Sequence, residues 1–223
     1  MGDGRMIKMK RNPNTPKFWD KLVDKVDNIP FNDHITKDRI KHVASLIPDE
    51  RIKVLDIGLG YGFLEKEIKL KKKYVSIYGI DISKKSVIRA KTLYGEKFVI
   101  GSAKAIPFPN NFFDVVCFLE VLEHIYEHES NSVFNEIKRV LKDSGNLIIS
   151  VPLYDKIYHG HPSAHVRVFT PEKLFEELLK NGFHKIKTRY LYAFSSLYKT
   201  KNVINRLLKL REPNNLIVVA RKK

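Results

Sequence analysis

Short apolar runs alternate along the chain with segments whose apolar residues recur at helical spacing. The runs predict buried strands at residues 54–57, 75–81, 97–100, 114–119 and 146–151, with two later strands at 183–192 and 216–220. Helical spacing or composition predicts helices at residues 38–47, 63–68, 84–93, 132–141 and 171–179, and a short amphipathic helix that begins at Phe18. This alternation predicts an α/β fold with a parallel sheet, whose ligands bind at the carboxyl ends of the strands.

The first strand runs directly into glycines on alternate positions, Gly58, Gly60 and Gly62. Glycine lets the backbone turn sharply and approach a ligand closely. A dinucleotide fingerprint would need its third glycine at position 63, which is Phe63, and no G-K-[ST] sequence of a P-loop follows. The spacing therefore favours a ligand without a pyrophosphate.

The second strand ends in an acid, Asp81. A carboxylate at the tip of this strand can accept hydrogen bonds from the hydroxyls of a ribose. Together with the glycine loop, it predicts an adenosine-type ligand.

Four blocks of sequence, in order, resemble the motifs of class I S-adenosylmethionine-dependent methyltransferases. They are residues 56–62, 79–83, 101–108 and 113–125. The likeness is to the small-molecule, ubiquinone-pathway-like branch known as type 11, and His165-Val166-Arg167-Val168-Phe169-Thr170-Pro171 is similar to those enzymes too. The resemblance implies a doubly wound, mostly parallel seven-stranded sheet of Rossmann-like type, with the last strand antiparallel. It also implies an enzyme with S-adenosyl-L-methionine as its cofactor.

The resemblance further implies which residues hold the amino-acid and ribose parts of the cofactor. Gly58 and Gly60 would let the backbone approach the amino-acid tail, and Asp56 would orient this loop or the ammonium group. Asp81 would hold the ribose hydroxyls. In this family an aromatic segment near the start of the domain often closes over the cofactor, and Trp19 is a candidate for that role.

The adenine end is expected to involve Ile82, Ser102, Ala103 and Leu119. Ile82 would pack on the ring. Ser102 departs from the acid that the family usually carries there, so recognition of the adenine amine by a side chain is weakened or moved to the backbone.

Acceptor chemistry should lie in the loops after strands four and five. The first loop carries Glu120, Glu123, His124 and His128, and the second carries Tyr154, Tyr158, His159, His161 and His165. Imidazole suits proton transfer near neutral pH, and we expect His124 and His165 as catalytic bases. The alternative is structural: His124 caps a helix and His165 binds loop backbone.

A metal site is a second alternative at this position. The pattern Glu120-x-x-Glu123-His124, with His161 or His165 later, is similar to the ligand set of small-RNA 3′-terminal 2′-O-methyltransferases, which use a divalent metal. The same Glu-Val-Leu-Glu-His-Ile run is also common in metal-free small-molecule enzymes, so no metal is expected.

The net charge of +16 favours anionic partners without identifying nucleic acid. Lysines at 69–73 and the basic residues at 221–223 fall at the edge of the sheet opposite the site, and we expect a solvated face there. Residues 193–213 are expected to form a basic lid-like insertion at the site end, with no acid in 193–211. Such a lid favours an acidic acceptor, whereas a solvated basic helix or a dimer contact is the alternative.

Residues 1–15 are expected to be a disordered basic tail, and 16–223 a single methyltransferase domain. The single cysteine, Cys117, lies in an apolar strand, which excludes a disulfide framework and favours a reducing compartment. With no apolar run near the ~18 residues of a membrane span and no signal peptide, we expect a cytoplasmic protein without membrane contact.

The sequence thus predicts a methyltransferase acting on oxygen or nitrogen of a small, anionic acceptor. The alternatives are an RNA methyltransferase, with a metal-dependent 2′-O reaction as one form of it, and a non-catalytic cofactor-binding partner protein. The acceptor and the oligomeric state stay open.

Overall fold

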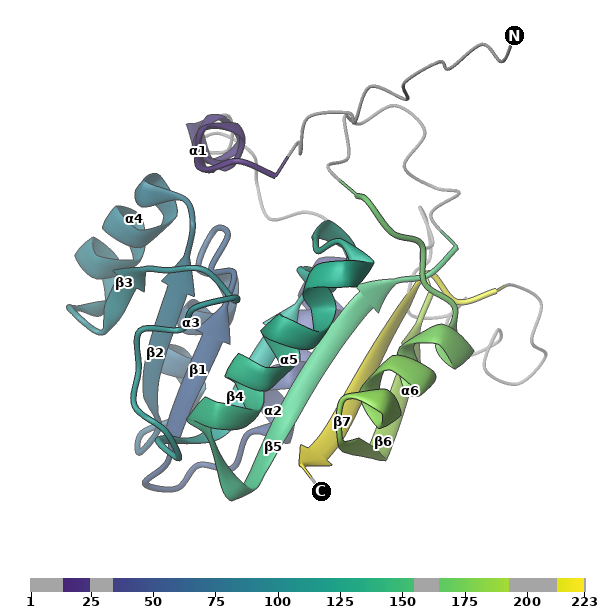
Figure 1. Cartoon of the computed structure of the whole chain (residues 1–223). Helices are drawn as coiled ribbons and strands as arrows, with labels where there is room; N and C mark the ends of the chain where they lie inside the picture. Colours follow the sequence, from purple (N-terminus) through teal and green to yellow (C-terminus); the bar gives the residue numbers. More distant parts are fainter. Residues whose placement is uncertain (1–13, 25–33, 155–164, 193–211, 223) are drawn as a thin grey trace, which may run out of the picture.

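The computed structural model describes residues 14–24, 34–154, 165–192 and 212–222, which form one seven-stranded sheet between two layers of helices (Figure 1). The strands are β1 (Lys53–Ile57), β2 (Ser76–Asp81), β3 (Phe98–Ile100), β4 (Phe113–Leu119), β5 (Leu141–Pro152), β6 (Phe183–Leu191) and β7 (Asn215–Lys222). The helices are α1 (Pro16–Asp24), α2 (His34–Leu46), α3 (Phe63–Lys71), α4 (Lys84–Tyr94), α5 (Glu127–Val140) and α6 (Pro171–Lys180), with a short 3₁₀ turn, η1 (Leu122–His124).

The strand order is β3-β2-β1-β4-β5-β7-β6. Strands β1 to β5 pair in parallel, and β7 is antiparallel to both of its neighbours, β5 and β6. The predicted doubly wound sheet with an antiparallel last strand is therefore confirmed.

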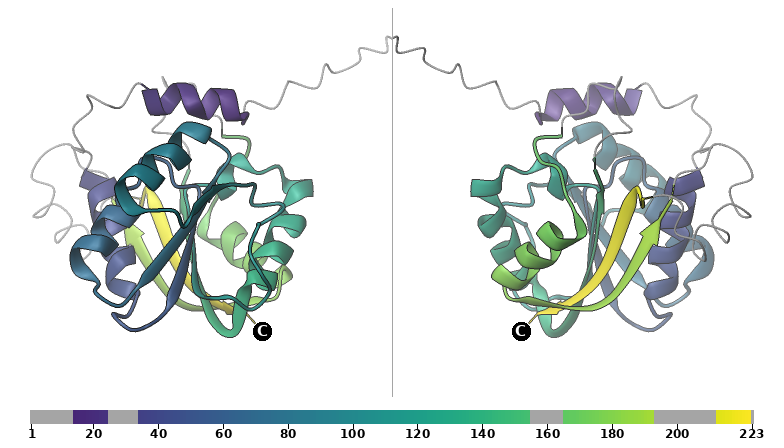
Figure 2. Two further views of the ribbon diagram at one scale, coloured as in Figure 1. Left: turned by 90° about the vertical axis from the view of Figure 1, so that its left-hand side faces the viewer. Right: turned by 90° about the vertical axis from the view of Figure 1, so that its right-hand side faces the viewer.

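Alternate residues of the central strands point into two separate apolar cores. Val116 packs with the residues of α5 and α6 on one face, whereas Val115 and Cys117 pack with those of α2, α3 and α4 on the other. Figure 2 shows these two helical layers on either side of the sheet. Because both faces of the sheet are covered by helices, ligands can reach the central strands only at the strand ends.

Several elements begin earlier than the sequence pattern predicts. Helix α2 starts at His34 rather than Asp38, α5 at Glu127 rather than Ser132, and β5 at Leu141 rather than Asn146. The first turns of α2 and α5 are mostly polar, and their one apolar residue, Ile35, is isolated in the sequence although the fold buries it, so periodicity does not reveal these turns.

Helix α1 lies across the edge formed by the carboxyl ends of β1, β2 and β4 (Figures 1 and 2). Thr15 Oγ1 accepts a hydrogen bond from Phe18 N at 3.3 Å, and Asn14 Nδ2 donates to His124 O at 3.0 Å. Asn14 and Thr15 therefore belong to the domain and not to the predicted tail, whose residues 1–13 lie outside the described part of the chain.

A buried serine connects α1 to α4. Ser83 caps α4, since its Oγ accepts a hydrogen bond from Ser86 N at 3.1 Å, and the same hydroxyl donates to Asp20 Oδ1 of α1 at 2.6 Å. Asp20 also accepts from Lys85 N at 3.1 Å. These hydrogen bonds lower the pKa of Asp20, so an ionised acid of α1 binds the start of α4 and holds α1 in position.

The segment between β6 and β7 leaves the sheet at the same edge. Leu191 pairs with Asn215, and Asn215 pairs with Pro152 at the end of β5. Residues 193–211 of the predicted lid lie outside the described residues. Among the helices that the structure describes, none combines the length and apolar character that crossing a membrane requires.

Replacing Ser83 by alanine should lower the free energy of unfolding by about 0.5–2 kcal/mol, because the α4 cap is lost, and should also raise amide hydrogen exchange throughout α1. Thr170 is the matched control. It caps α6 by accepting from Lys173 N, far from α1, so Thr170→Ala should cost similar stability and leave α1 exchange unchanged. Equal exchange in α1 for both variants would show that Ser83 does not hold α1.

Candidate active site

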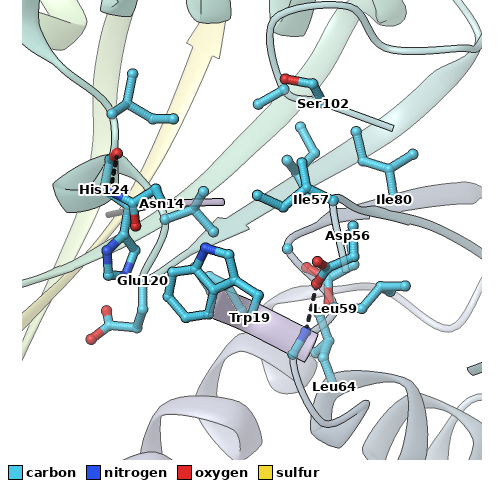
Figure 3. A pocket seen from close by; sticks show the side chains of 18 of the residues that line it. Asn14, Trp19, Asp56, Ile57, Leu59, Leu64, Ile80, Ser102, Glu120 and His124 are labelled. Carbon is cyan, nitrogen blue, oxygen red and sulfur yellow. Dashed lines mark hydrogen bonds between the residues drawn. The ribbon is translucent and has the colours of Figure 1, made fainter. Parts of the chain in front are cut away.

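A cavity of about 510 Å³ opens at the carboxyl ends of β1, β2 and β4, beneath α1 (Figure 3). Its lining includes every residue predicted to contact the cofactor: Asp56, Gly58, Gly60, Asp81, Ile82, Ser102, Ala103 and Leu119. Trp19 also lines the cavity, and Figure 3 shows its indole between His124 and Asp56. The sequence therefore identified a set of residues that the fold brings together.

The glycine loop adopts a backbone that other residues rarely take. Gly58, Gly60 and Gly62 have φ values of 87°, 51° and 76°. A Cβ on Gly58 would lie 2.5 Å from Val121 Cγ2, whereas a Cβ on Gly60 would meet nothing within 4 Å. The loop therefore presents bare backbone to the cavity, as close approach to a ligand requires.

Asp81 lies at the cavity with both carboxylate oxygens in use. Its Oδ2 accepts from Gly60 N at 3.1 Å and its Oδ1 from Ser83 N at 2.7 Å. Burial raises the pKa of Asp81 even though these hydrogen bonds oppose the shift. Each oxygen keeps a further lone pair, so the carboxylate can still accept from ribose hydroxyls.

A second buried acid stands behind the loop. Glu65 of α3 is 0% exposed and Asp56 is 3% exposed. No donor within the described part of the chain reaches either oxygen of Glu65 or Asp56 Oδ1. Burial raises the pKa of Asp56 well above its usual value and that of Glu65 to about 7, and the proximity of the two groups raises the pKa of Asp56 further. Such a pair holds a shared proton near neutral pH.

Sequence reasoning missed Glu65, because a glutamate in a lysine- and glutamate-rich helix resembles a solvated surface residue. Its burial follows from its place in the first turn of α3, where the helix packs back against β1. Burial also raises the pKa of the nearby Cys117 thiol well above its usual value, so this thiol is not a reactive nucleophile.

The loop after β3 forms the adenine end of the predicted site. Ser102 Oγ accepts from Lys104 N at 3.2 Å within its own loop, and Lys104 Nζ contacts Glu129 Oε1 at 2.7 Å. The Ser102 hydroxyl is thus used locally.

Glu120 begins the acceptor end, in a left-handed backbone conformation with φ 54°. Its carboxylate accepts from Ser150 Oγ at 2.8 Å and from Asn215 Nδ2 at 2.9 and 2.8 Å. Arg39 Nη1 of α2 lies 3.1 Å from Glu120 Oε2. Arg39 also lines the cavity, and the sequence analysis missed it because no motif marks it.

The two predicted acceptor loops meet at a pair of histidines. The Glu123 carbonyl accepts from Val166 N at 2.9 Å and from Arg167 N at 3.3 Å, which brings the two loops together. The rings of His124 and His165 have centroids 4.9 Å apart, and Trp19 packs edge-on against His124 at 4.8 Å. His124 lines the cavity.

The other predicted acceptor residues do not all join this pair. His128 is exposed on α5, where it stacks on Tyr126. Tyr154 packs against the core. Tyr158, His159 and His161 lie outside the described residues.

Comparison with known proteins places this site in a family. Residues 55–149 match the family model of a methyltransferase domain, type 11. This match identifies residues 55–149 as a methyltransferase domain of the class I S-adenosylmethionine-dependent type. The cofactor of this family is S-adenosyl-L-methionine, and the bare glycine backbone, Asp81 and the buried acid pair suit a ribose and a cationic amino-acid tail.

Relatives of this chain include proteins of known and unknown activity. An uncharacterized protein of Methanocaldococcus jannaschii is 30% identical over 146 residues, 66% of this chain and 61% of that protein. The demethylmenaquinone methyltransferase of Thermotoga maritima is 28% identical over 144 residues, 63% of this chain and 62% of that enzyme. The chain thus spans less than two thirds of the length of these two relatives.

A solved structure of similar fold is the Haloferax volcanii methyltransferase in complex with the Trm112 methyltransferase activator. Its TM-score is 0.68 at 19% identity, and the match covers 92% of this chain and 97% of that one. Identity this low compares the folds alone.

The acid pair makes stability depend on pH. Between about pH 4.5 and 7, folded Glu65 keeps a proton that the unfolded chain releases, so the folded state binds more protons. The free energy of unfolding should therefore fall as the pH rises through this window. Glu65→Gln removes one of the two titrating acids, and Asp56 remains, so the variant should show a shallower decline in urea unfolding at pH 5, 6, 7 and 8. Parallel profiles for the two proteins would contradict the buried pair.

Proposed function

We propose that this chain transfers the methyl group of S-adenosyl-L-methionine to an oxygen or nitrogen of a small acceptor. The observation that carries the proposal is one cavity that joins the predicted cofactor residues at one end to His124 at the other. The cavity volume of about 510 Å³ lies in the range of about 300–1,000 Å³ that small-molecule sites occupy.

The chain's own residues would bind and orient the cofactor. The loop at Gly58 and Gly60 offers backbone to its amino-acid tail, Asp81 accepts from its ribose hydroxyls, and Trp19 covers it from α1. When bound, the cofactor supplies an electrophilic methyl group on a sulfonium. The buried negative charge shared by Asp56 and Glu65 favours this cation over the neutral thioether product.

Methyl transfer demands alignment and, where the attacking atom carries a proton, a group that takes it. His124 and His165 are our proposed proton acceptors. His124 lies at the acceptor end of the cavity, where Trp19 packs on one side of its ring and His165 contacts it from behind the lining. A neutral imidazole there accepts the proton as the acceptor lone pair bonds to the methyl carbon.

The charge of the acceptor depends on a part of the chain that the structure does not describe. Within the described residues, Arg39 is paired with Glu120 and Lys104 with Glu129. The expectation that the acceptor is anionic is therefore supported only by the basic composition of residues 193–211. The apolar side chains of Trp19, Ile40 and Ile125 in the lining suit an acceptor with an apolar body, and one relative is named for demethylmenaquinone.

The direct test of this function uses methyl-labelled cofactor and fractionated host extract, followed by identification of the labelled product. We expect label in a small molecule. Transfer of label into RNA would support the RNA methyltransferase alternative. Cofactor binding without transfer to any fraction would support a non-catalytic partner protein.

The role of Asp81 can be measured by calorimetric titration with S-adenosylhomocysteine and its 2′-deoxy analogue. Asp81→Ala should weaken binding of the full ligand by at least about 1.5 kcal/mol, because charge-assisted hydrogen bonds are lost. Because Asp81 also holds Gly60 and Ser83, the deoxy analogue is the control. The variant should bind both ligands equally, and a preserved preference for the 2′-hydroxyl would refute the ribose contact.

Loss of the His165 imidazole should lower kcat without changing the affinity for the cofactor. We expect His165→Ala to reduce kcat by about 10²–10⁴-fold and to leave affinity for S-adenosylhomocysteine unchanged, since His165 is not among the lining residues. His184→Ala is the matched control, because His184 is exposed at the start of β6, at the end of the sheet away from the cavity. Equal kcat for the two variants would remove His165 from the site.

A further inference from the structure

We infer that Glu123, His124 and His165 form a binding site for a divalent transition-metal ion at the acceptor end of the cavity. Each offers one ligand atom, and these atoms all lie within 4.8 Å of one another. The inference about cation binding stands on this geometry alone. Only the role of the ion in acceptor chemistry rests on the proposed function.

The structure separates two glutamates that the sequence pattern treats alike. The carboxylate of Glu120 is committed to Ser150, Asn215 and Arg39. Glu123 instead turns toward the histidines, with its Oε1 3.9 Å from His124 Nε2. The ligand set is therefore Glu123 with the two imidazoles, without Glu120.

Backbone contacts hold the three groups in place from two loops. Glu123 and His124 both lie in the η1 turn. The Glu123 carbonyl accepts hydrogen bonds from the backbone amides of the two residues that follow His165. Asn14 binds the His124 carbonyl from the start of the domain. Ligand atoms about 2.1 Å from a shared ion lie about 3–3.5 Å apart, so side-chain rotation of roughly 1–1.5 Å would complete the site.

The donor set selects the kind of ion. Two imidazoles and one carboxylate suit Zn²⁺, Co²⁺, Fe²⁺ or Mn²⁺, whereas Mg²⁺ and Ca²⁺ prefer oxygen ligands. Three protein ligands also leave coordination positions open for a further molecule. Because His124 lines the cavity, these open positions would face the acceptor.

Such a site identifies the acceptor class as a hydroxyl compound. A hydroxyl bound to the ion has a lowered pKa and gives its proton to solvent. The oxygen lone pair then bonds to the methyl carbon, and the electrons of the broken carbon–sulfur bond stay on sulfur as the thioether. With an ion bound, His124 and His165 would be its ligands; without one, they keep the proton-acceptor role of the proposed function.

The test titrates untagged, chelator-treated full-length protein with Zn²⁺ by calorimetry and with Co²⁺ by visible absorption. We expect one equivalent of ion and Co²⁺ bands typical of nitrogen and oxygen ligands. Glu123→Gln and His165→Ala should each weaken Zn²⁺ binding by more than about 100-fold. Loss of a residue that only supports a metal ligand costs about 10- to 100-fold, and loss of the ligand itself should cost more. Glu120→Gln is the matched carboxylate control and should leave Zn²⁺ affinity within about threefold of the unchanged protein, as the scatter of such interaction energies allows.

Binding of S-adenosylhomocysteine to each variant reports that it has folded, and His165→Asn replaces His165→Ala if the latter does not fold. Absence of stoichiometric Zn²⁺ and Co²⁺ binding would overturn the inference, as would undiminished binding in Glu123→Gln and the His165 variant. Cofactor binding and methyl transfer without ion binding would remove the metal and keep the proposed function. Ion binding without methyl transfer would keep the site and remove the proposed function.

Discussion

The carboxylate of Asp81 connects the parts of the cofactor-binding edge. One oxygen accepts from Gly60 in the glycine loop and the other from Ser83, whose hydroxyl reaches Asp20 of α1. The loop below the cavity and the helix above it thus depend on one buried acid. Backbone donors favour the ionised form of Asp81, yet burial still raises its pKa, so desolvation outweighs the hydrogen bonds. Hydroxyl donors of a bound ribose would offset part of that remaining cost.

Local charge in the cavity differs in sign from the charge of the whole chain. The chain carries +16, but the cofactor end is built on the buried acids Asp56, Glu65 and Asp81. Surface lysines act through water and salt, which screen them over about 8–10 Å, whereas neighbouring buried acids interact through a medium of low dielectric constant. The potential that a bound cation meets is therefore set by these three acids. The net charge of the chain indicates which partners the surface attracts, whereas the buried acids determine which ligand charge the cavity favours.

Local patterns in the sequence were enough to predict the sheet and to choose cofactor candidates that prove to line one cavity. Apolar runs followed by glycines or an acid define β1 and β2, and the parallel sheet brings Asp56, Gly60 and Asp81 to one edge. Contacts between distant segments left no such signal. Arg39 of α2 meets Glu120 after β4, and Glu65 becomes a functional candidate only because α3 buries it. The polar first turns of α2 and α5 were missed for the related reason that periodicity reports the buried face alone.

The network around Glu120 explains how one spacing of acids produces two different roles. Arg39, Ser150 and Asn215 come from α2, β5 and β7 and converge on this carboxylate directly after β4. The Arg39–Glu120 pair is partly buried. Such an ion pair adds little net stability, because desolvation opposes its attraction, but leaving either charge without its partner would be costly. The network thus ties Glu120, in its left-handed backbone conformation, to three other elements of the fold. The ligand atoms that lie together belong instead to Glu123, His124 and His165. Two acids three residues apart in the sequence therefore take different places in the structure.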